Sequence, residues 1–132
     1  ETGHLVLGSL HTNSAAQSID RMIDVFPPHQ QPQIRAQLSN ILMAVCSQRL
    51  IPAIGGGRSV AAEVLIANPA VRNIIREGKS HQLDAVIQTS ADQGMQTMDR
   101  TLVGMVQSGA VTYDEARGFA VDVTEFERLM RG

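Results

Sequence analysis

Two histidines near the start of the chain, His4 and His11, are the first candidates for chemistry. Residues 4–10 (HLVLGSL) are apolar and broken by one glycine, a pattern that predicts a β-strand buried on both faces within an α/β sheet. Seven residues of strand span roughly 23 Å. The two rings would then lie at opposite ends of the strand, too far apart to share one zinc ion. We therefore expect no metal site here and a separate role for each histidine.

His11 holds the more favourable position, at the carboxyl end of the predicted strand and just before a capping box (SAAQ) that begins at Ser14. Ligands of open α/β sheets bind at this edge, and the free N–H groups of a helix N-terminus attract anions. His11, Thr12 and Asn13 therefore form a donor-rich turn suited to a phosphate group. An ordinary polar helix cap is the alternative that the residues leave open, and a backbone hydrogen bond is the simpler role for His4.

The composition fits one globular domain and excludes several classes of protein. The chain has 132 residues, of which 43% are hydrophobic and 18% charged, enough for a single core. A net charge of −2 gives no bulk attraction to nucleic acid or anionic membrane. No window holds 18 consecutive apolar residues and no secretory signal is visible, so we expect a cytoplasmic location without membrane insertion. The single cysteine, Cys46, excludes an internal disulfide, and its apolar neighbours predict a buried thiol.

The first half of the chain predicts two helices followed by a hairpin. Ser14 opens a helix that ends at Pro27-Pro28. A second helix is expected from about Gln30 to Val45. Two extended runs, 47–54 and 58–67, flank three glycines and predict a β-hairpin with a flexible tip.

The second half predicts only short helices. Asn68 and Pro69 fit the start of a helix and Gly78 its end, and Ser80 can cap the next one. Gly78-Lys79-Ser80 matches the end of a P-loop signature. However, Asn73 stands where its first glycine belongs and a helix precedes it, so a P-loop is rejected. Because a lone apolar strand requires neighbours, the order indicates the back half of an α/β domain with a helical extension.

The stretch AVRNIIREGK, residues 70–79, predicts an amphipathic helix. Arg72 and Arg76 are four residues apart and share one face of it. Two interpretations stay open: a surface helix with solvated arginines, or a helix that binds a partner protein.

Three segments carry a resemblance to a known family. GHLVLGSLHTNSA (3–15) resembles the His box of the type II/type IV secretion ATPases. AVRNIIREGK resembles the AIRNLIRE motif of their pilus-retraction branch, and IQTSADQGMQTMD (87–99) resembles the stretch that follows that motif. Ser9, Val71 and Ile75 depart from the usual residues. Assembly and secretion relatives usually carry paired CxxC motifs, so a lone Cys46 favours the retraction branch.

The resemblance implies an α/β fold: the C-terminal portion of a RecA-like P-loop NTPase core in residues 1–67, and a small all-helical subdomain in 68–132. It implies a hexameric motor that hydrolyses ATP with Mg²⁺ to power type IV pilus retraction and twitching motility. The family's Walker A and B motifs would precede Glu1. We therefore expect a C-terminal fragment that is inactive alone and holds no cofactor.

The resemblance also assigns site residues and partners. It places His11 and His4 in catalysis and His11, Thr12 and Asn13 against the nucleotide. The retraction motif covers eight residues: Ala70, Val71, Arg72, Asn73, Ile74, Ile75, Arg76 and Glu77. The implied partners are further copies in a homohexamer and inner-membrane pilus proteins, with a cytoplasmic location peripheral to that membrane and no nucleic acid. Two alternatives remain: a pilus-assembly or type II secretion ATPase, and a non-catalytic helical adaptor.

Overall fold

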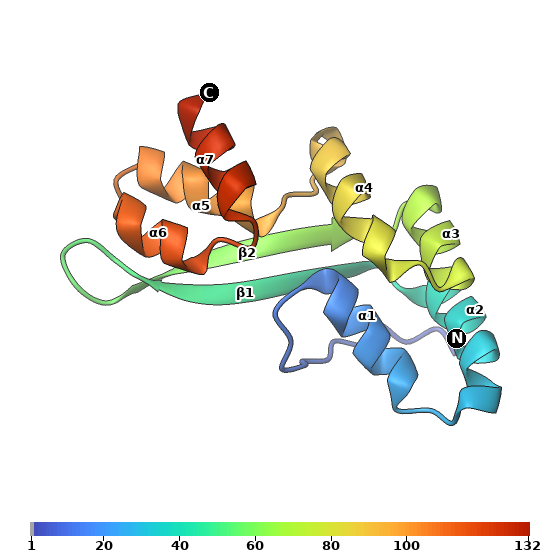
Figure 1. Ribbon diagram of the computed structural model, residues 1–132. Helices are drawn as coiled ribbons and strands as arrows, with labels where there is room; N and C mark the ends of the chain where they lie inside the picture. Colours follow the sequence, from blue (N-terminus) through green and yellow to red (C-terminus); the bar gives the residue numbers. More distant parts are fainter. Residues whose placement is uncertain (1) are drawn as a thin grey trace.

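The computed structural model describes residues 2–132, in which short helices surround one long β-hairpin (Figure 1). In chain order the elements are α1 (Ala15–Asp24), the 3₁₀ turn η1 (Pro28–Gln30), α2 (Gln31–Ile41), β1 (Ala44–Pro52), β2 (Arg58–Ile66), α3 (Pro69–Glu77), η2 (Ser80–Gln82), α4 (Leu83–Thr89), η3 (Ala91–Gln93), α5 (Met98–Gln107), α6 (Tyr113–Phe119) and α7 (Val123–Arg131). No helix among the described residues has the length and apolar character needed to cross a membrane.

The predicted hairpin is confirmed and forms the spine of the fold. β1 and β2 pair antiparallel along their whole length, from Ala44 opposite Ile66 to Pro52 opposite Arg58. The tip is closed by a hydrogen bond from the Ala53 N–H to the Gly57 carbonyl at 3.0 Å. All three tip glycines have positive φ, a conformation that costs glycine nothing and explains why the turn contains them.

Two hydrophobic cores form along the hairpin, with α1–α4 gathered at one end and α5–α7 at the other (Figure 1). Leu65 of β2 belongs to the first core, whereas Ala61 of β2 and Ile51 of β1 belong to the second. The first core draws on both sides of the proposed boundary between 67 and 68, for example Ile19 and Ile75. The division into 1–67 and 68–132 stays a prediction.

The strand predicted for residues 4–10 is wrong in this structure. The segment has no regular secondary structure, and Leu5, Val6 and Leu7 are 74%, 81% and 89% exposed. A strand requires a hydrogen-bonded neighbour, and the sheet within residues 2–132 consists of β1 and β2 alone. The apolar residues that suggested a buried strand therefore have nothing to pack against in the described part of the chain.

The predictions for the second helix and for Cys46 also fail, for one shared reason. The helix ends at Ile41 instead of Val45, because the chain from Ala44 onward pairs with β2. Side chains alternate along β1, and Ser47 and Ile51 point into the interior. Cys46 has the opposite parity and is exposed.

Most of the predicted helix ends are confirmed by their caps. The side chains of Ser14 and Asn68 each accept a backbone N–H three residues on, and Gly78 ends α3 in the left-handed region with φ of 70°. Ser80 does not cap a helix. Its hydroxyl donates instead to Asp20 Oδ1 at 2.7 Å, which ties η2 to α1.

Candidate functional site

The turn from His11 to Ser14 leads directly into α1 and is held by that helix. The Asn13 N–H donates to Gln17 Oε1 at 2.8 Å, and the Gln17 N–H donates to Ser14 Oγ at 3.1 Å. The Thr12 hydroxyl shares a hydrogen bond with the Ser18 hydroxyl, which donates in turn to the Ser14 carbonyl at 3.0 Å. The backbone path of the turn is therefore fixed by the first two turns of α1.

The first N–H group of α1 already has a partner within the chain, contrary to the expectation that the N–H groups at this end are all free for a ligand. The Ala15 N–H, the first of the helix, donates to Glu63 Oε1 at 2.9 Å. The Gln17 N–H is taken by Ser14. A phosphate at this edge would therefore meet side chains of the turn, such as the His11 ring, and not the amide of Ala15.

His4 and His11 are both exposed, and no hydrogen bond joins them in the described chain. His4 Nδ1 shares a hydrogen bond with the Thr2 hydroxyl at 3.1 Å. His11 has no side-chain hydrogen bond to any residue between 2 and 132, so its ring nitrogens face solvent. Across the same residues no group of three His, Cys, Asp or Glu side chains is placed to hold a metal ion.

Glu63 is the residue of this region that the sequence analysis missed. It lies on β2 in phase with Ala61 and Leu65, and its side chain is only 6% exposed. Burial raises the pKa of the Glu63 carboxyl, and the charges of Asp84 and Asp99 raise it further, against the lowering effect of the Ala15 and Met98 N–H groups. The available signal was a lone charge at an inward position of an apolar strand, since such charges are seldom buried without a partner.

The retraction motif of residues 70–77 forms most of α3, and its residues separate into three groups. Val71, Ile74 and Ile75 are buried in the first core. Arg72 donates from Nη1 to the carbonyls of Ser39 and Asn40 at 2.6 and 3.0 Å, which neutralises the C-terminal end of α2. The remaining four, Ala70, Asn73, Arg76 and Glu77, are exposed.

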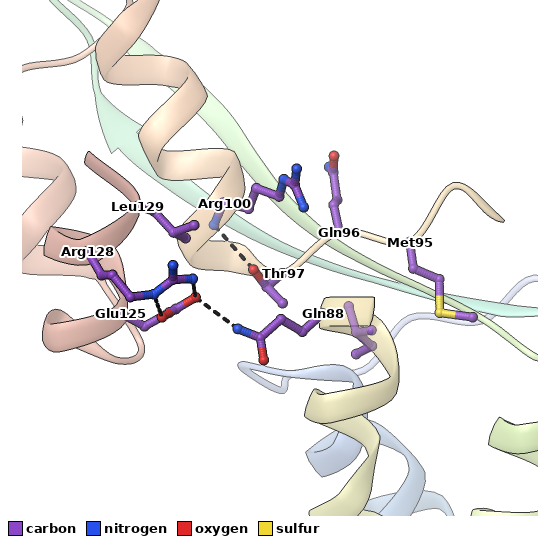
Figure 2. A pocket seen from close by; sticks show the side chains of 9 residues that line it. Gln88, Met95, Gln96, Thr97, Arg100, Glu125, Arg128 and Leu129 are labelled. Atoms are coloured by element: carbon purple, nitrogen blue, oxygen red, sulfur yellow. Dashed lines mark hydrogen bonds and ion pairs between the residues drawn. The ribbon is translucent and has the colours of Figure 1, made fainter. Parts of the chain in front are cut away.

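A small hollow of about 130 Å³ lies elsewhere, where α4, α5 and α7 approach one another (Figure 2). Its lining includes Gln88 of α4, Arg100 of α5, and Glu125 and Arg128 of α7. None of the predicted site residues contributes to it. The hollow therefore lies where the two groups of helices meet, and it is not the predicted nucleotide site.

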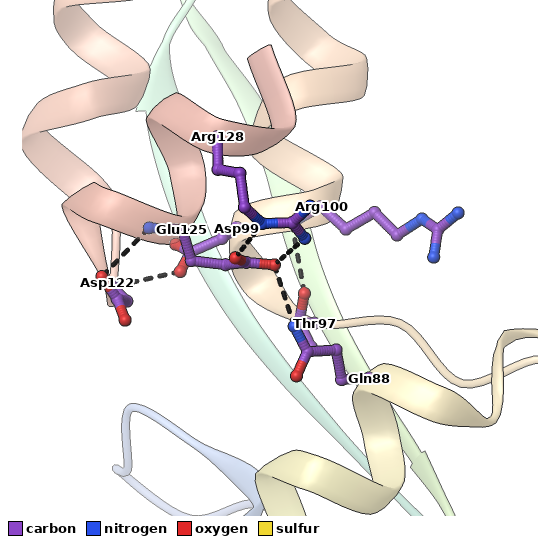
Figure 3. A network of polar contacts seen from close by, with 7 residues as sticks. All are labelled: Gln88, Thr97, Asp99, Arg100, Asp122, Glu125 and Arg128. Carbon is purple, nitrogen blue, oxygen red and sulfur yellow. Dashed lines mark hydrogen bonds and ion pairs between the residues drawn. The ribbon is translucent and has the colours of Figure 1, made fainter. Parts of the chain in front are cut away.

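A polar network spans this junction (Figure 3). Gln88 Nε2 donates to Glu125 Oε1 at 2.8 Å, and Arg128 donates to both oxygens of the same carboxylate at 2.7 Å. The buried carboxylate of Asp99 accepts the N–H groups of Val121 and Asp122 at 2.7 and 2.9 Å, which fixes the start of α7. Every carboxylate of this network has a partner within the chain, which indicates a structural role.

Comparison with known proteins shows which proteins this chain is similar to. The model of the family described as "Type II/IV secretion system protein" matches residues 1–56. The type IV pilus retraction ATPase PilT of Pseudomonas aeruginosa is 51% identical over 117 residues, covering 89% of this chain and 34% of that protein. A twitching motility protein of Neisseria gonorrhoeae is 50% identical over 118 residues, covering 89% of this chain and 32% of that protein. The chain thus spans about a third of the length of these relatives.

The fold agrees with the sequence comparison. A crystal structure described as the pilus retraction motor PilT with bound ADP superposes with a TM-score of 0.85 and 48% identity, covering 97% of this chain and 36% of that one. The match falls in the C-terminal region of that motor, which confirms the expected fold class. The chain is therefore similar to members of the type II/IV secretion system protein family over residues 1–56, and over most of its length to proteins described as pilus-retraction motors.

Proposed function

We propose that the complete gene product containing this chain is an ATP-hydrolysing motor that powers type IV pilus retraction. The observation that carries the proposal is the 51% identity, over 89% of the chain, to a protein named as a pilus retraction ATPase. A second relative at 50% identity is named for twitching motility. Both names favour retraction over the alternatives of pilus assembly and type II secretion.

Within this motor, His11, Thr12 and Asn13 contact the nucleotide, and His11 and His4 act in catalysis. Phosphoryl transfer requires positioned donors for the charge that develops on the phosphate oxygens. The exposed His11 ring, free of partners among residues 2–132, supports its assignment as such a donor. Thr12 and Asn13 hold the turn, since the Thr12 hydroxyl and the Asn13 N–H are already bonded to α1.

Mg²⁺ would accompany the ATP, and its chemistry is charge neutralisation on the phosphates. The turn offers an imidazole, an amide and a hydroxyl that is already bonded to Ser18, whereas Mg²⁺ prefers carboxylate and phosphate oxygens. We therefore assign Mg²⁺ to no residue of this chain. The role proposed for the turn from His11 to Ser14 is to place the His11 side chain at the nucleotide.

The exposed side of α3 is the proposed contact with the pilus machinery at the inner membrane, and the motor is proposed to be a cytoplasmic homohexamer. Arg72 is committed to α2, so Arg76 is the arginine of α3 that is left for a partner. Arg76→Ala is expected to lower the frequency of pilus retraction about tenfold, the effect of losing one strong interface residue. ATP turnover of the purified variant should stay within about twofold of the wild type.

Arg21→Ala is the matched control for Arg76→Ala, because Arg21 is an exposed arginine in the last turn of α1. Retraction events per cell are counted by live fluorescence imaging of labelled pili. Equal losses for the two variants would contradict a specific role for α3.

ATP turnover by the complete gene product tests the proposed function. The purified complete protein is expected to release phosphate from ATP, whereas the 132-residue chain should show no turnover. Calorimetry of the chain with ATP should detect no micromolar binding, because these 132 residues contain no P-loop signature to hold the phosphates. No turnover by the complete protein, or tight ATP binding by the chain, would overturn the proposal.

A further inference from the structure

The hydrogen bond between Glu63 and Ala15 joins two segments that are 48 residues apart in sequence. Ala15 is completely buried and directly follows the turn that contains His11. The other hydrogen bonds of the turn all lead back to α1 itself, through Gln17 and Ser18. The Glu63 carboxyl is therefore the polar tie that connects the hairpin to the turn and to the start of α1, and the Met98 N–H at the start of α5 also acts on it.

The charged form of Glu63 is disfavoured where the side chain lies, by burial and by neighbouring negative charges. The charged side chains that act on its carboxylate, Asp84 of α4 and Asp99 of α5, are both negative. Ser47 lies directly opposite Glu63 in the strand pairing, and its hydroxyl is buried without a hydrogen-bond partner. Burying a carboxylate without a cation disfavours folding, and an apolar residue of similar size often serves stability better. Stability alone therefore gives a poor account of this residue.

The N-terminus of α1 gives a physical reason for a carboxyl side chain at position 63. The first N–H groups of an α-helix carry a partial positive charge and have no partner within the helix. A carboxylate aimed at one of them fixes both the direction of the helix and the position of the residues that precede it. In this chain those residues include Thr12 and Asn13, and His11 comes directly before them.

We propose that Glu63 is a positioning residue for the nucleotide-contacting turn: through the Ala15 N–H it fixes the place from which His11 reaches the phosphate. This inference rests on the proposed function for the role of His11. The contact with Ala15 is independent of that function. Glu63 itself touches no substrate in this account.

The test compares Glu63→Ala with Glu63→Gln in the complete gene product. The glutamine retains an oxygen for the Ala15 N–H and removes the negative charge. Glu63→Ala is expected to lower kcat for ATP about 10- to 100-fold through misplacement of His11, with little change in KM. Glu63→Gln should keep kcat within about threefold. Hydrogen exchange of residues 11–18, followed by mass spectrometry, should accelerate in the alanine variant and not in the glutamine variant.

Asp99→Ala is the matched control, because Asp99 is also a buried carboxylate that accepts backbone N–H groups, but at α7. Asp99→Ala should lower the melting temperature without loss of kcat and without faster exchange of residues 11–18, because removing its charge only relieves the repulsion on Glu63. Equal loss of kcat in Glu63→Ala and Asp99→Ala, or equal loss in the alanine and glutamine variants, would overturn the inference. If His11→Ala abolishes turnover while Glu63→Ala changes neither turnover nor exchange, the inference alone fails. If His11→Ala leaves turnover intact, the role proposed for His11 fails, and the exchange data still decide whether Glu63 anchors the turn.

Discussion

Replacing His11 with alanine is expected to lower kcat for ATP hydrolysis by the complete gene product about 100-fold, the effect of removing one donor from a charge-stabilising site. The expected loss appears in kcat more than in KM, because the donor acts on charge that develops during phosphoryl transfer. The His11 ring is exposed and makes no hydrogen bond with residues 2–132, so its removal should change the free energy of unfolding by less than about 0.5 kcal/mol. Steady-state phosphate release gives both kinetic constants.

His29→Ala is the control for His11→Ala, because His29 is an exposed histidine in η1, away from the turn. Its turnover should equal that of the wild type. Wild-type kcat in the His11 variant would contradict the proposed role. A melting temperature that falls together with kcat would also contradict the proposed role, because the loss of kcat would then come from unfolding.

Replacing Phe126 with alanine is expected to lower the free energy of unfolding by about 3–5 kcal/mol, the range for removing a buried aromatic side chain. Phe126 is 0% exposed in the second core, and its ring centroid lies 5.6 Å from that of Tyr113. The chain has three phenylalanines, one tyrosine and no tryptophan, so no other large ring is buried in this core to the same degree.

Urea unfolding of the 132-residue chain measures this loss, with Phe26→Ala as the matched control. Phe26 is 37% exposed. Phe26→Ala should therefore lower the free energy of unfolding by less than about 1 kcal/mol, since most of the penalty for such a substitution comes from the cavity that it leaves. Similar midpoints for the two variants would show that Phe126 is not buried in the second core as described.

Elements with local signals were predictable from the sequence. Ser14 and Asn68 cap helices because each side chain accepts an N–H three residues away, a contact within the same short segment. The hairpin followed from the three glycines of its tip. Each of these features is determined by neighbours along the chain, which the sequence displays directly.

Elements that depend on distant partners were mispredicted or missed. The segment 4–10 has the composition of a strand, but composition does not provide the neighbouring strand that it requires. The end of α2 and the exposure of Cys46 depend on the pairing of β1 with β2, which overrides the helical pattern. Glu63 was missed for the same reason, because its role depends on a hydrogen bond to Ala15, far away in sequence.

The candidate site was predictable in part. The position of His11 before a capped helix, together with the family resemblance, indicated the turn from His11 to Ser14. The sequence did not reveal that the first amide of α1 is already occupied, which moves the expected phosphate contact from the helix N-terminus to the His11 side chain. In the retraction motif it did not distinguish Arg72, which is bonded to α2, from the exposed Arg76.

Pilus retraction in cells that lack the gene tests the central claim most directly. Labelled pili are imaged in the wild type, in the deletion strain, and in the deletion strain carrying the intact gene. The account predicts that the deletion strain assembles pili that do not retract, and that the intact gene restores retraction. Retraction at the wild-type rate in the deletion strain, or the absence of assembled pili, would contradict it.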